Sequence, residues 1–130
     1  MSEPARAVVA GHGDVAAGFV SAVAQITGRG ECLHPLSNRG LGSTELEGAL
    51  RAALDLTGAG VVFTDLPAGS VTRAACRVAR ERPGLVVVAG VNLAVLLDFV
   101  FRTDDAAVAA GAAVQKGHEA LFVVGGVGER

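Results

Sequence analysis

Tryptophan and tyrosine are absent from this chain of 130 residues, and phenylalanine occurs only five times. Aromatic side chains supply the stacking surfaces of proteins that bind single-stranded nucleic acid. Positive charge is also scarce, because 11 Lys and Arg stand against 13 Asp and Glu, which gives a formal net charge of −2. A nucleic-acid-binding face needs a cluster of basic residues. The composition therefore predicts that nucleic acid is not a partner.

Cysteine is rare as well. Cys32 and Cys76 are the two cysteines, and they do not form a Cys-x-x-Cys motif. We interpret each as a buried, reduced thiol rather than as half of a disulfide or of a redox pair.

A membrane-spanning run is also missing from the sequence. The longest apolar stretch, Val86 to Phe101, is interrupted by Asn92 and Asp98 and is shorter than the roughly 20 residues that cross a bilayer. Residues 1–6 contain Glu3 and no basic segment that leads into an apolar one, so they do not resemble a signal peptide. We expect a cytoplasmic protein.

Hydrophobic residues make up 51% of the chain and glycine 18 positions, and apolar runs alternate with helix-like segments without a linker. This pattern predicts one domain over residues 1–130. Four runs are predicted strands: Ala7–Gly11, Cys32–Leu36, Val61–Asp65 and Leu85–Gly90. The alternation predicts an α/β fold, a doubly wound and mainly parallel sheet with the flavodoxin-like order 2-1-3-4. A last strand is predicted at Ala120–Val124.

Polar residues mark where the helices between these strands are expected to begin. The predicted caps are Asp14, Thr44 paired with Glu47, Ser70, Asn92, and the Thr103-Asp104-Asp105 segment. Gly28 and Gly117 are expected to end the first and the last helix.

The candidate site follows from the strand order. Open α/β sheets place their sites at the carboxyl ends of strands where the order reverses, here between the first and third strands. His12 ends the first strand, flanked by Gly11 and Gly13, and Asp65 ends the third. A carboxylate beside an imidazole fixes its tautomer and stabilises positive charge, so we interpret His12 as a nucleophile that Asp65 orients. His12 could also bind a metal, and Asp65 could instead cap a turn.

The turn after Asp65 favours an anion. Residues 66–70 lead into a predicted helix start, where backbone N–H groups and the helix dipole attract negative charge, and Ser70 adds a hydroxyl. The remaining histidines fit other roles, His34 as a core or edge residue and His118 as a helix cap. Arg73 could approach a phosphate, although a solvated helix face is the more common role.

Several segments, in this order and spacing, resemble the enzyme IIA components of the mannose family of the bacterial phosphoenolpyruvate-dependent sugar phosphotransferase system. They are Gly11-His12-Gly13, Val62-Phe63-Thr64-Asp65-Leu66, Gly69-Ser70 and Ala89-Gly90-Val91-Asn92-Leu93. The resemblance runs from about Val8 to Val124. It implies a phosphotransferase in which His12 accepts a phosphoryl group from HPr and passes it to a IIB component for sugar uptake. Contact with the membrane would come only through the IIC and IID partners, and no metal or organic cofactor is implied.

The resemblance also assigns roles to single residues. Asp65 matches the aspartate that accepts a hydrogen bond from Nδ1 of the active histidine, which leaves Nε2 to take the phosphoryl group. Gly69 and Ser70 match the phosphate-binding turn, and Asn92 matches an asparagine that we expect to shape the site. Members of the family are homodimers in which a C-terminal strand pairs antiparallel with the partner's sheet, which predicts such an exchange for Ala120–Val124.

One motif departs from the family. The family turn reads Gly-Gly-Ser/Thr-Pro, whereas this chain has Ala68-Gly69-Ser70-Val71, which puts the phosphate contacts and the docking partner in question. Two alternatives to a transport phosphocarrier stay open. One is a regulatory phosphoacceptor with the same chemistry, and the other is a metal-handling enzyme similar to the small chelatases, which needs a second ligand histidine in the same crevice.

Overall fold

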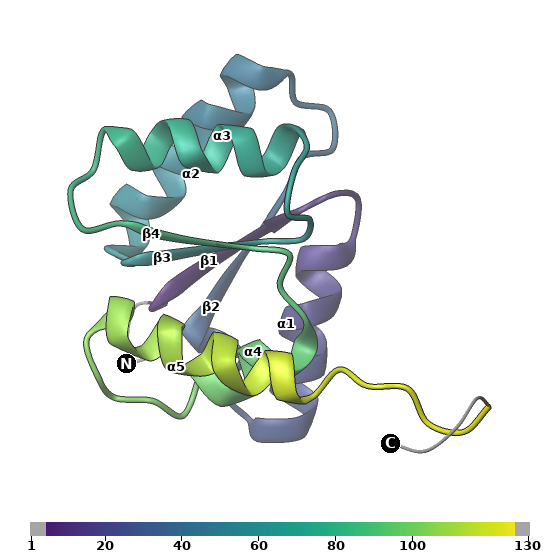
Figure 1. Ribbon diagram of the computed structural model, residues 1–130. Helices are drawn as coiled ribbons and strands as arrows, with labels where there is room; N and C mark the ends of the chain where they lie inside the picture. Colours follow the sequence, from purple (N-terminus) through teal and green to yellow (C-terminus); the bar gives the residue numbers. More distant parts are fainter. Residues whose placement is uncertain (1–4, 127–130) are drawn as a thin grey trace.

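The computed structural model describes residues 5–126, which form a parallel sheet between two layers of helices (Figure 1). The strands are β1 (Ala7–Gly11), β2 (Leu33–Ser37), β3 (Val61–Thr64) and β4 (Val86–Ala89). The helices are α1 (Val15–Thr27), α2 (Ser43–Thr57), α3 (Ser70–Arg80), α4 (Leu93–Phe99) and α5 (Ala106–Glu119), with a 3₁₀ turn, η1, at Gly30–Cys32. Among the described residues, no helix is both long and apolar enough to cross a membrane.

The sheet has the order β2-β1-β3-β4, and every pairing is parallel. The predicted α/β class, parallel sheet and strand order are therefore confirmed. In β1 the register places Gly11 opposite Ser37 of β2 and Ala10 opposite Thr64 of β3. The segments that follow these strands consequently all start at the same end of the sheet, where the carboxyl ends of the strands lie.

Alternate strand residues contribute to two cores, one on each face of the sheet. Val8 and Val62 face the layer of α2 and α3, while Val9 and Phe63 face the layer of α1, α4 and α5. Side chains of successive strand residues point to opposite faces, and both faces are covered, which explains why the strands read as continuous apolar runs. In the core on the side of α1, α4 and α5, the rings of Phe63 and Phe99 meet edge to face, with their centroids 5.1 Å apart.

Three of the predicted helix caps are wrong in detail. The side chain of Asp14 makes no cap hydrogen bond and pairs instead with Arg39 at 2.9 Å. Helix α2 begins before Thr44, and Glu45 accepts a hydrogen bond from the Gly42 N–H at 2.8 Å. Helix α3 is preceded by Gly69, whose φ of 107° suits glycine alone, so Ser70 is its first helical residue rather than its cap.

Gly117 lies inside α5, which continues to Glu119, so the prediction that it ends this helix is wrong. The reason for glycine at this position is close packing against α4. A Cβ on Gly117 would stand 2.1 Å from Cγ2 of Val95 and 3.0 Å from Oδ1 of Asn92. The Asn92 amide nitrogen also donates to the Gly117 carbonyl at 3.0 Å.

This contact gives a prediction about stability. Gly117→Ala should lower the free energy of unfolding by about 1–3 kcal/mol, because the added methyl overfills the contact between α4 and α5. Gly111→Ala, in the same helix but with no atom within 4 Å of the new Cβ, should instead raise it by about 1 kcal/mol through helix propensity. Urea unfolding of both variants checks the pair. Equal effects of the two substitutions would contradict the packing explanation.

The predicted strand at Ala120–Val124 is not formed within the described chain. Ala120 caps the end of α5, and Leu121–Val124 are not part of a strand. Figure 1 shows this segment leading away from the helices, with Leu121 81% and Val124 76% exposed. A strand needs a neighbouring strand to satisfy its backbone hydrogen bonds, and the sheet of the described residues consists of β2, β1, β3 and β4 alone.

Candidate functional site

The site is formed where β1 and β3 end side by side. The His12 backbone N–H donates to Oδ2 of Asp65 at 2.8 Å, and the imidazole Nδ1 lies 2.8 Å from the same oxygen. His12 and Asp65 are 53 positions apart in the sequence, and parallel pairing of β1 with β3 brings them together. The predicted neighbourhood of these two residues is therefore confirmed.

The Asp65 carboxylate is held in its ionised form. Burial raises the pKa of its carboxyl, but the hydrogen bonds from the His12 backbone and imidazole lower it, and the pKa of Asp65 lies below its usual value of 3.8. An ionised carboxylate can only accept hydrogen bonds, so Nδ1 of His12 carries a proton in this contact. In the neutral ring the other nitrogen, Nε2, then has a free lone pair, and the side chain is 45% exposed.

Gly11 makes this contact possible. A Cβ at Gly11 would stand 2.4 Å from Cγ1 of Val15 and 3.1 Å from Oδ2 of Asp65. Any larger residue would displace either the start of α1 or the carboxylate. Gly11 therefore serves the site by its lack of a side chain.

The loop that follows His12 is fixed from the side of β2. Gly13 has a φ of 56°, in the left-handed region that favours glycine. The Ser37 hydroxyl donates to the Gly13 carbonyl at 2.8 Å, and the Gly13 N–H donates to Oδ1 of Asn38 at 3.3 Å. Sequence reasoning assigned no role to Ser37 or Asn38. The available signal was their place after β2, which neighbours β1 in the predicted order.

The turn between Asp65 and α3 is held by two buried threonines that sequence reasoning also missed. The hydroxyls of Thr64 and Thr72 lie 2.7 Å apart, and the Thr72 hydroxyl donates to the Leu66 carbonyl at 2.6 Å. These bonds join the end of β3 to the first turn of α3. They set the direction in which α3 starts next to Asp65.

Helix α3 presents an uncapped start to this region. Gly69 precedes the helix and Ser70 opens it, and no side chain caps its first turn. The same holds for α1, which begins at Val15, three residues after His12. Helices α4 and α5, in contrast, are capped by Asn92 and Asp105. Two helix starts whose cap residues make no side-chain hydrogen bond thus flank the site, although the Val15 N–H of α1 donates to the His12 carbonyl at 3.1 Å. Helix starts favour an anion.

Asn92 makes contacts of a different kind from those of the other predicted site residues. Its Oδ1 accepts from the Val95 N–H at 3.0 Å, and its amide nitrogen donates to Gly117. These contacts cap α4 and join it to α5. Asn92 would therefore influence His12 indirectly, by setting where α4 and α5 lie. Its site-shaping role stays a prediction.

A metal site is not assembled by the described residues, since no group of three or more His, Cys, Asp or Glu in residues 5–126 could hold an ion. His34 lies on β2 and His118 near the end of α5. Neither is a second ligand histidine beside His12, which removes the support for a chelatase-like site in this part of the chain.

Comparisons with known proteins point to one family. The model of the EIIA-man family, described as PTS system fructose IIA component, matches residues 6–116. No curated protein sequence matches the chain significantly.

Similar solved structures share this fold at low sequence identity. The mannose/sorbose-specific IIA subunit of Enterococcus faecalis has a TM-score of 0.79 and 20% identity over 99% of this chain and 100% of its own. The EIIA component of Streptococcus agalactiae has a TM-score of 0.82 and 20% identity over 91% of this chain and 95% of its own. A IIA protein associated with the fucose utilization operon of Streptococcus pneumoniae has a TM-score of 0.78 and 22% identity over 95% of this chain and 96% of its own.

Proposed function

Because the chain belongs to the EIIA-man family of the sugar phosphotransferase system, we propose that it is a phosphocarrier whose phosphoryl group is held on His12. The donor in this proposal is the phosphorylated form of HPr, and the acceptor is a IIB component that serves sugar uptake. The observation that carries the proposal is the 2.8 Å contact between Nδ1 of His12 and an Asp65 carboxylate whose pKa is lowered.

The chemistry is a direct transfer between two imidazoles. Nε2 of His12 attacks the phosphorus, a P–N bond forms there, and the P–N bond of the donor histidine breaks with its electron pair returning to the donor ring. Positive charge develops on the His12 ring and is stabilised by Asp65 through Nδ1–H. Positioning and charge stabilisation supply most of the catalysis in phosphoryl transfer. The Asp65 carboxylate contacts both the backbone N–H and the ring of His12, so it is suited to position the ring and to stabilise its charge.

The phosphoryl oxygens would meet the start of α3. Unpaired backbone N–H groups of its first turn and the Ser70 hydroxyl are donors suited to an anion, and Gly69 lets the chain enter the helix with a φ of 107°. Ala68 and Val71, which replace the family's glycine and proline, leave these donors in place. We propose that the altered turn still binds the phosphoryl group.

The test is phosphorylation of the purified chain by phosphoenolpyruvate, enzyme I and HPr. We expect a mass gain of about 80 Da that is lost in acid, because a phosphoramidate hydrolyses in acid whereas a serine phosphate survives. Addition of a IIB component should then remove the label. Labelling without transfer to any IIB component would favour the regulatory phosphoacceptor, and absence of labelling by competent HPr would contradict both phosphoacceptor functions.

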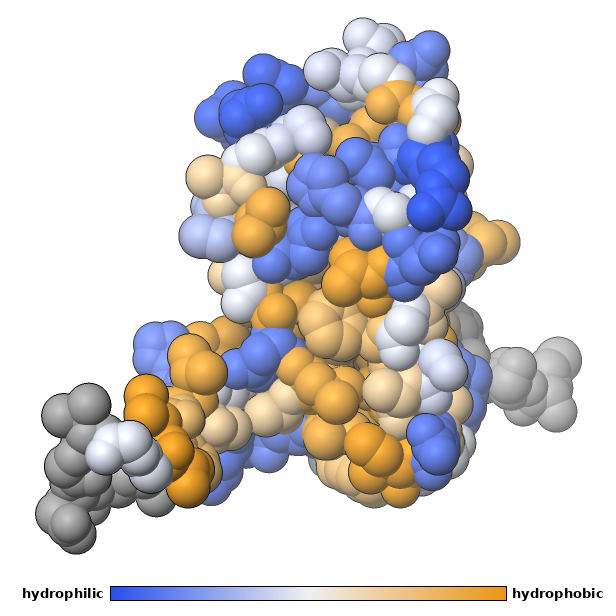
Figure 2. All heavy atoms as spheres, turned by 90° about the vertical axis from the view of Figure 1, so that its right-hand side faces the viewer, coloured by the Kyte–Doolittle hydropathy of each residue, from blue (hydrophilic) through white to orange (hydrophobic). Residues whose placement is uncertain are grey.

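We also propose that residues 121–124 complete the sheet of a second copy as an antiparallel strand. Two features support this exchange. Strand β4 pairs only with β3 in the described chain, and its Val86, Val87 and Val88 are half-buried. The segment Leu121–Val124 is apolar, exposed and of the same length as β4. Figure 2 shows apolar residues gathered along this segment and over the adjacent layer of the molecule.

Removal of this segment should therefore change the oligomeric state. A chain that ends at Ala120 is expected to be a monomer of about half the mass of the intact protein in solution, measured by light scattering. A chain that ends at Gly126 keeps the segment and should remain a dimer. A dimer in both truncated forms would show that another surface holds the two copies together.

A further inference from the structure

Arg39 and Asp14 form an ion pair beside His12 that takes no part in the transfer between the imidazoles. Nη1 of Arg39 lies 2.9 Å from Oδ1 of Asp14. Arg39 comes from the loop between β2 and α2, and Asp14 stands two positions after His12, just before α1. The Asp14 carboxylate makes no cap hydrogen bond to α1 and binds Arg39 instead.

The backbone fixes Arg39 next to this histidine. The Ser37 hydroxyl accepts a hydrogen bond from the Arg39 N–H at 3.0 Å and donates to the Gly13 carbonyl at 2.8 Å. Nη2 of Arg39 lies 3.4 Å from the point that a Cβ on Gly13 would occupy. The guanidinium therefore lies against the residue that directly follows His12. It lies on the β2 side of the site, whereas Asp65 ends β3 on the other side of β1.

The ion pair is suited to exchange partners. Both side chains are well exposed, Arg39 at 67% and Asp14 at 85%. Exposed ion pairs add little stability, because water competes for both charges, so little is lost when this one opens. A guanidinium presents its N–H donors in a planar fork that binds two oxygens of a phosphoryl group through parallel hydrogen bonds.

Phosphorylation of His12 creates a need for such a cation. A phosphoryl group adds a charge of about −1.5 to −2 to a site that already holds the carboxylates of Asp65 and Asp14. Asp65 is occupied by the His12 ring, and the charge of Asp14 repels the new one. The flexible side chain of Arg39 starts next to His12 and is paired with Asp14, so it is placed to offset the added charge.

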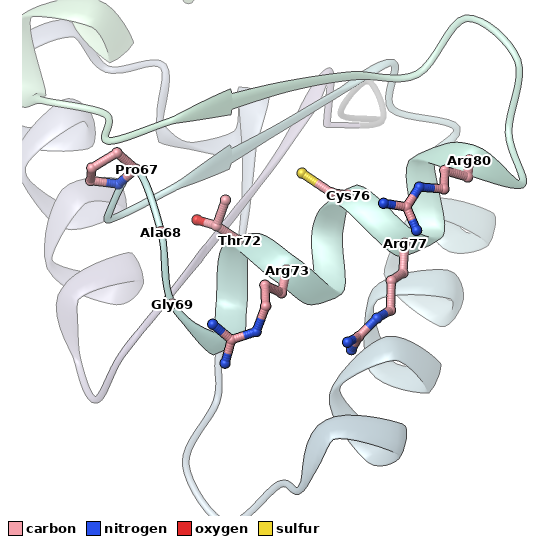
Figure 3. A pocket seen from close by; sticks show the side chains of 8 residues that line it. All are labelled: Pro67, Ala68, Gly69, Thr72, Arg73, Cys76, Arg77 and Arg80. Carbon is pink, nitrogen blue, oxygen red and sulfur yellow. The ribbon is translucent and has the colours of Figure 1, made fainter.

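A second cation near the site, Arg73, has a different setting. It lines a groove of about 420 Å³ along α3. The lining residues are Pro67, Ala68, Gly69, Thr72, Arg73, Cys76, Arg77 and Arg80. Figure 3 shows them spread from the turn along the helix. No hydrogen bond or ion pair of the described residues joins Arg73 to the loop of His12, so Arg39 is the better placed of the two arginines.

We propose that Arg39 binds the phosphoryl group that His12 carries and releases Asp14 to do so. The inference rests on the proposed function and adds a second phosphoryl-binding element to it, on the β2 side of the site. Arg39 stays protonated and donates N–H hydrogen bonds to phosphoryl oxygens. The P–N bonds still form and break at His12 and at the donor histidine.

The test measures the equilibrium of phosphoryl transfer between the chain and HPr. Phosphorylated chain, freed of enzyme I, is mixed with unphosphorylated HPr, and mass spectrometry of the intact proteins gives the labelled fraction of each. Arg39→Gln should shift this equilibrium toward phosphorylated HPr by about tenfold, because the phosphoryl group loses a hydrogen bond from a charged donor. Arg39→Lys keeps the charge without the fork and should recover part of the shift.

The matched control is Arg82→Gln. Arg82 forms a similar surface ion pair, with Asp55 at 2.6 Å, and it precedes β4 at the opposite end of the sheet. The control variant should equilibrate with HPr as the wild type does.

Asp14→Asn shows whether Arg39 acts on the phosphoryl group or only on Asp14. This substitution should favour the phosphorylated chain, because it frees Arg39 and removes a repelling charge. In the Asp14→Asn background, Arg39→Gln should still cost about tenfold. If the effect of Arg39→Gln vanishes in that background, Arg39 only masks Asp14 and the direct contact is wrong.

Phosphorus NMR gives a readout that a merely structural role would not move. A bound guanidinium favours the fully ionised phosphoryl group. Arg39→Gln should therefore raise the pH at which the ³¹P resonance of the phosphorylated chain titrates, whereas Arg82→Gln should leave it unchanged. An unchanged titration in Arg39→Gln would contradict the contact.

The outcomes separate this inference from the proposed function. If the wild type takes label from HPr and Arg39→Gln matches Arg82→Gln in both measurements, Arg39 does not bind the phosphoryl group and the phosphocarrier function stands. If Arg73→Gln shifts the equilibrium and Arg39→Gln does not, the cation comes from α3 and the assignment to Arg39 is wrong. If the wild type takes no label from competent HPr, the phosphocarrier function itself is wrong and the inference falls with it.

Discussion

Replacement of His12 by alanine is expected to abolish phosphoryl acceptance. The imidazole is the nucleophile in the proposed transfer, and among the described residues no other histidine is paired with a carboxylate. The readout is the acid-labile gain of about 80 Da, measured by mass spectrometry of the intact protein after incubation with phosphoenolpyruvate, enzyme I and HPr. Wild-type protein should gain one phosphoryl group and His12→Ala none.

The fold should survive this change. The His12 side chain is 45% exposed, and the backbone N–H of residue 12 can still donate to Oδ2 of Asp65 in the variant. The lost imidazole contact should cost about 1–2 kcal/mol of unfolding free energy.

The chain contains three histidines, which gives two matched controls. His118→Ala changes an exposed residue of α5, and His34→Ala a half-buried residue of β2, and both should accept label as the wild type does. Label retained by His12→Ala but lost from either control would move the phosphorylation site away from His12.

The second large effect is expected for Asp65→Asn. The amide keeps a polar group near Nδ1 but carries no charge, so the proton on Nδ1 and the charge that develops in transfer are less stabilised. A hydrogen bond to a charged group contributes roughly 1.5–3 kcal/mol, and its loss should slow transfer from HPr by about 10- to 100-fold. Single-turnover transfer kinetics measure this effect. In addition, ¹⁵N NMR should find the proton of the wild-type ring on Nδ1.

The control for this variant is Asp55→Asn. Asp55 lies on α2 and forms a surface ion pair with Arg82, so the substitution removes the same charge away from the site. It should transfer at the wild-type rate. Wild-type kinetics for Asp65→Asn as well would reduce Asp65 to a structural residue of the turn.

The pKa of Asp65 adds a stability signature. Its folded value lies below the usual 3.8, so the interaction stabilises the folded protein at pH above that value and is lost as the pH falls through the folded pKa. The stability difference between wild type and Asp65→Asn should therefore be largest near neutral pH and shrink below pH 3.8. A difference that does not change with pH would show that the charge of Asp65 contributes nothing to folding.

The sequence predicted the strands and the site because both depend on patterns that are local. Continuous apolar runs predicted a sheet covered on both faces, and the alternation of strands and helices predicted its order. The order then placed His12 beside Asp65, since parallel strands end at one edge. The chemistry of the site was predicted from the residue types at these two strand ends, a histidine and an aspartate.

Helix boundaries were predicted less well. Ser70 was assigned as a cap because its residue type favours caps, yet the cap position belongs to Gly69, whose positive φ admits no other residue easily. Thr44 and Glu47 fit a capping box by spacing, but Glu45 makes the bond to Gly42. Several residues near a helix start compete for the same N–H groups, and the path of the incoming chain decides among them.

The residues that support the site could not be predicted from local patterns. Asn38 and Ser37 hold the Gly13 loop from β2, and Thr72 binds the Leu66 carbonyl from α3. Each contact joins segments whose relative placement follows only from packing the helices on the sheet. Gly117 is similar, because glycine there is explained by Val95 of another helix.

The sequence by itself thus determined the fold class, the strand order and the pair of His12 and Asp65, because hydrophobic periodicity and strand ends are properties of contiguous residues. The three-dimensional structure was needed to show that one oxygen of Asp65 receives both hydrogen bonds from His12, and that Arg73, Arg77 and Arg80 line a groove beginning at the same turn. These features depend on side-chain directions and on distances of a few ångströms between segments, which form only when the helices pack against the sheet.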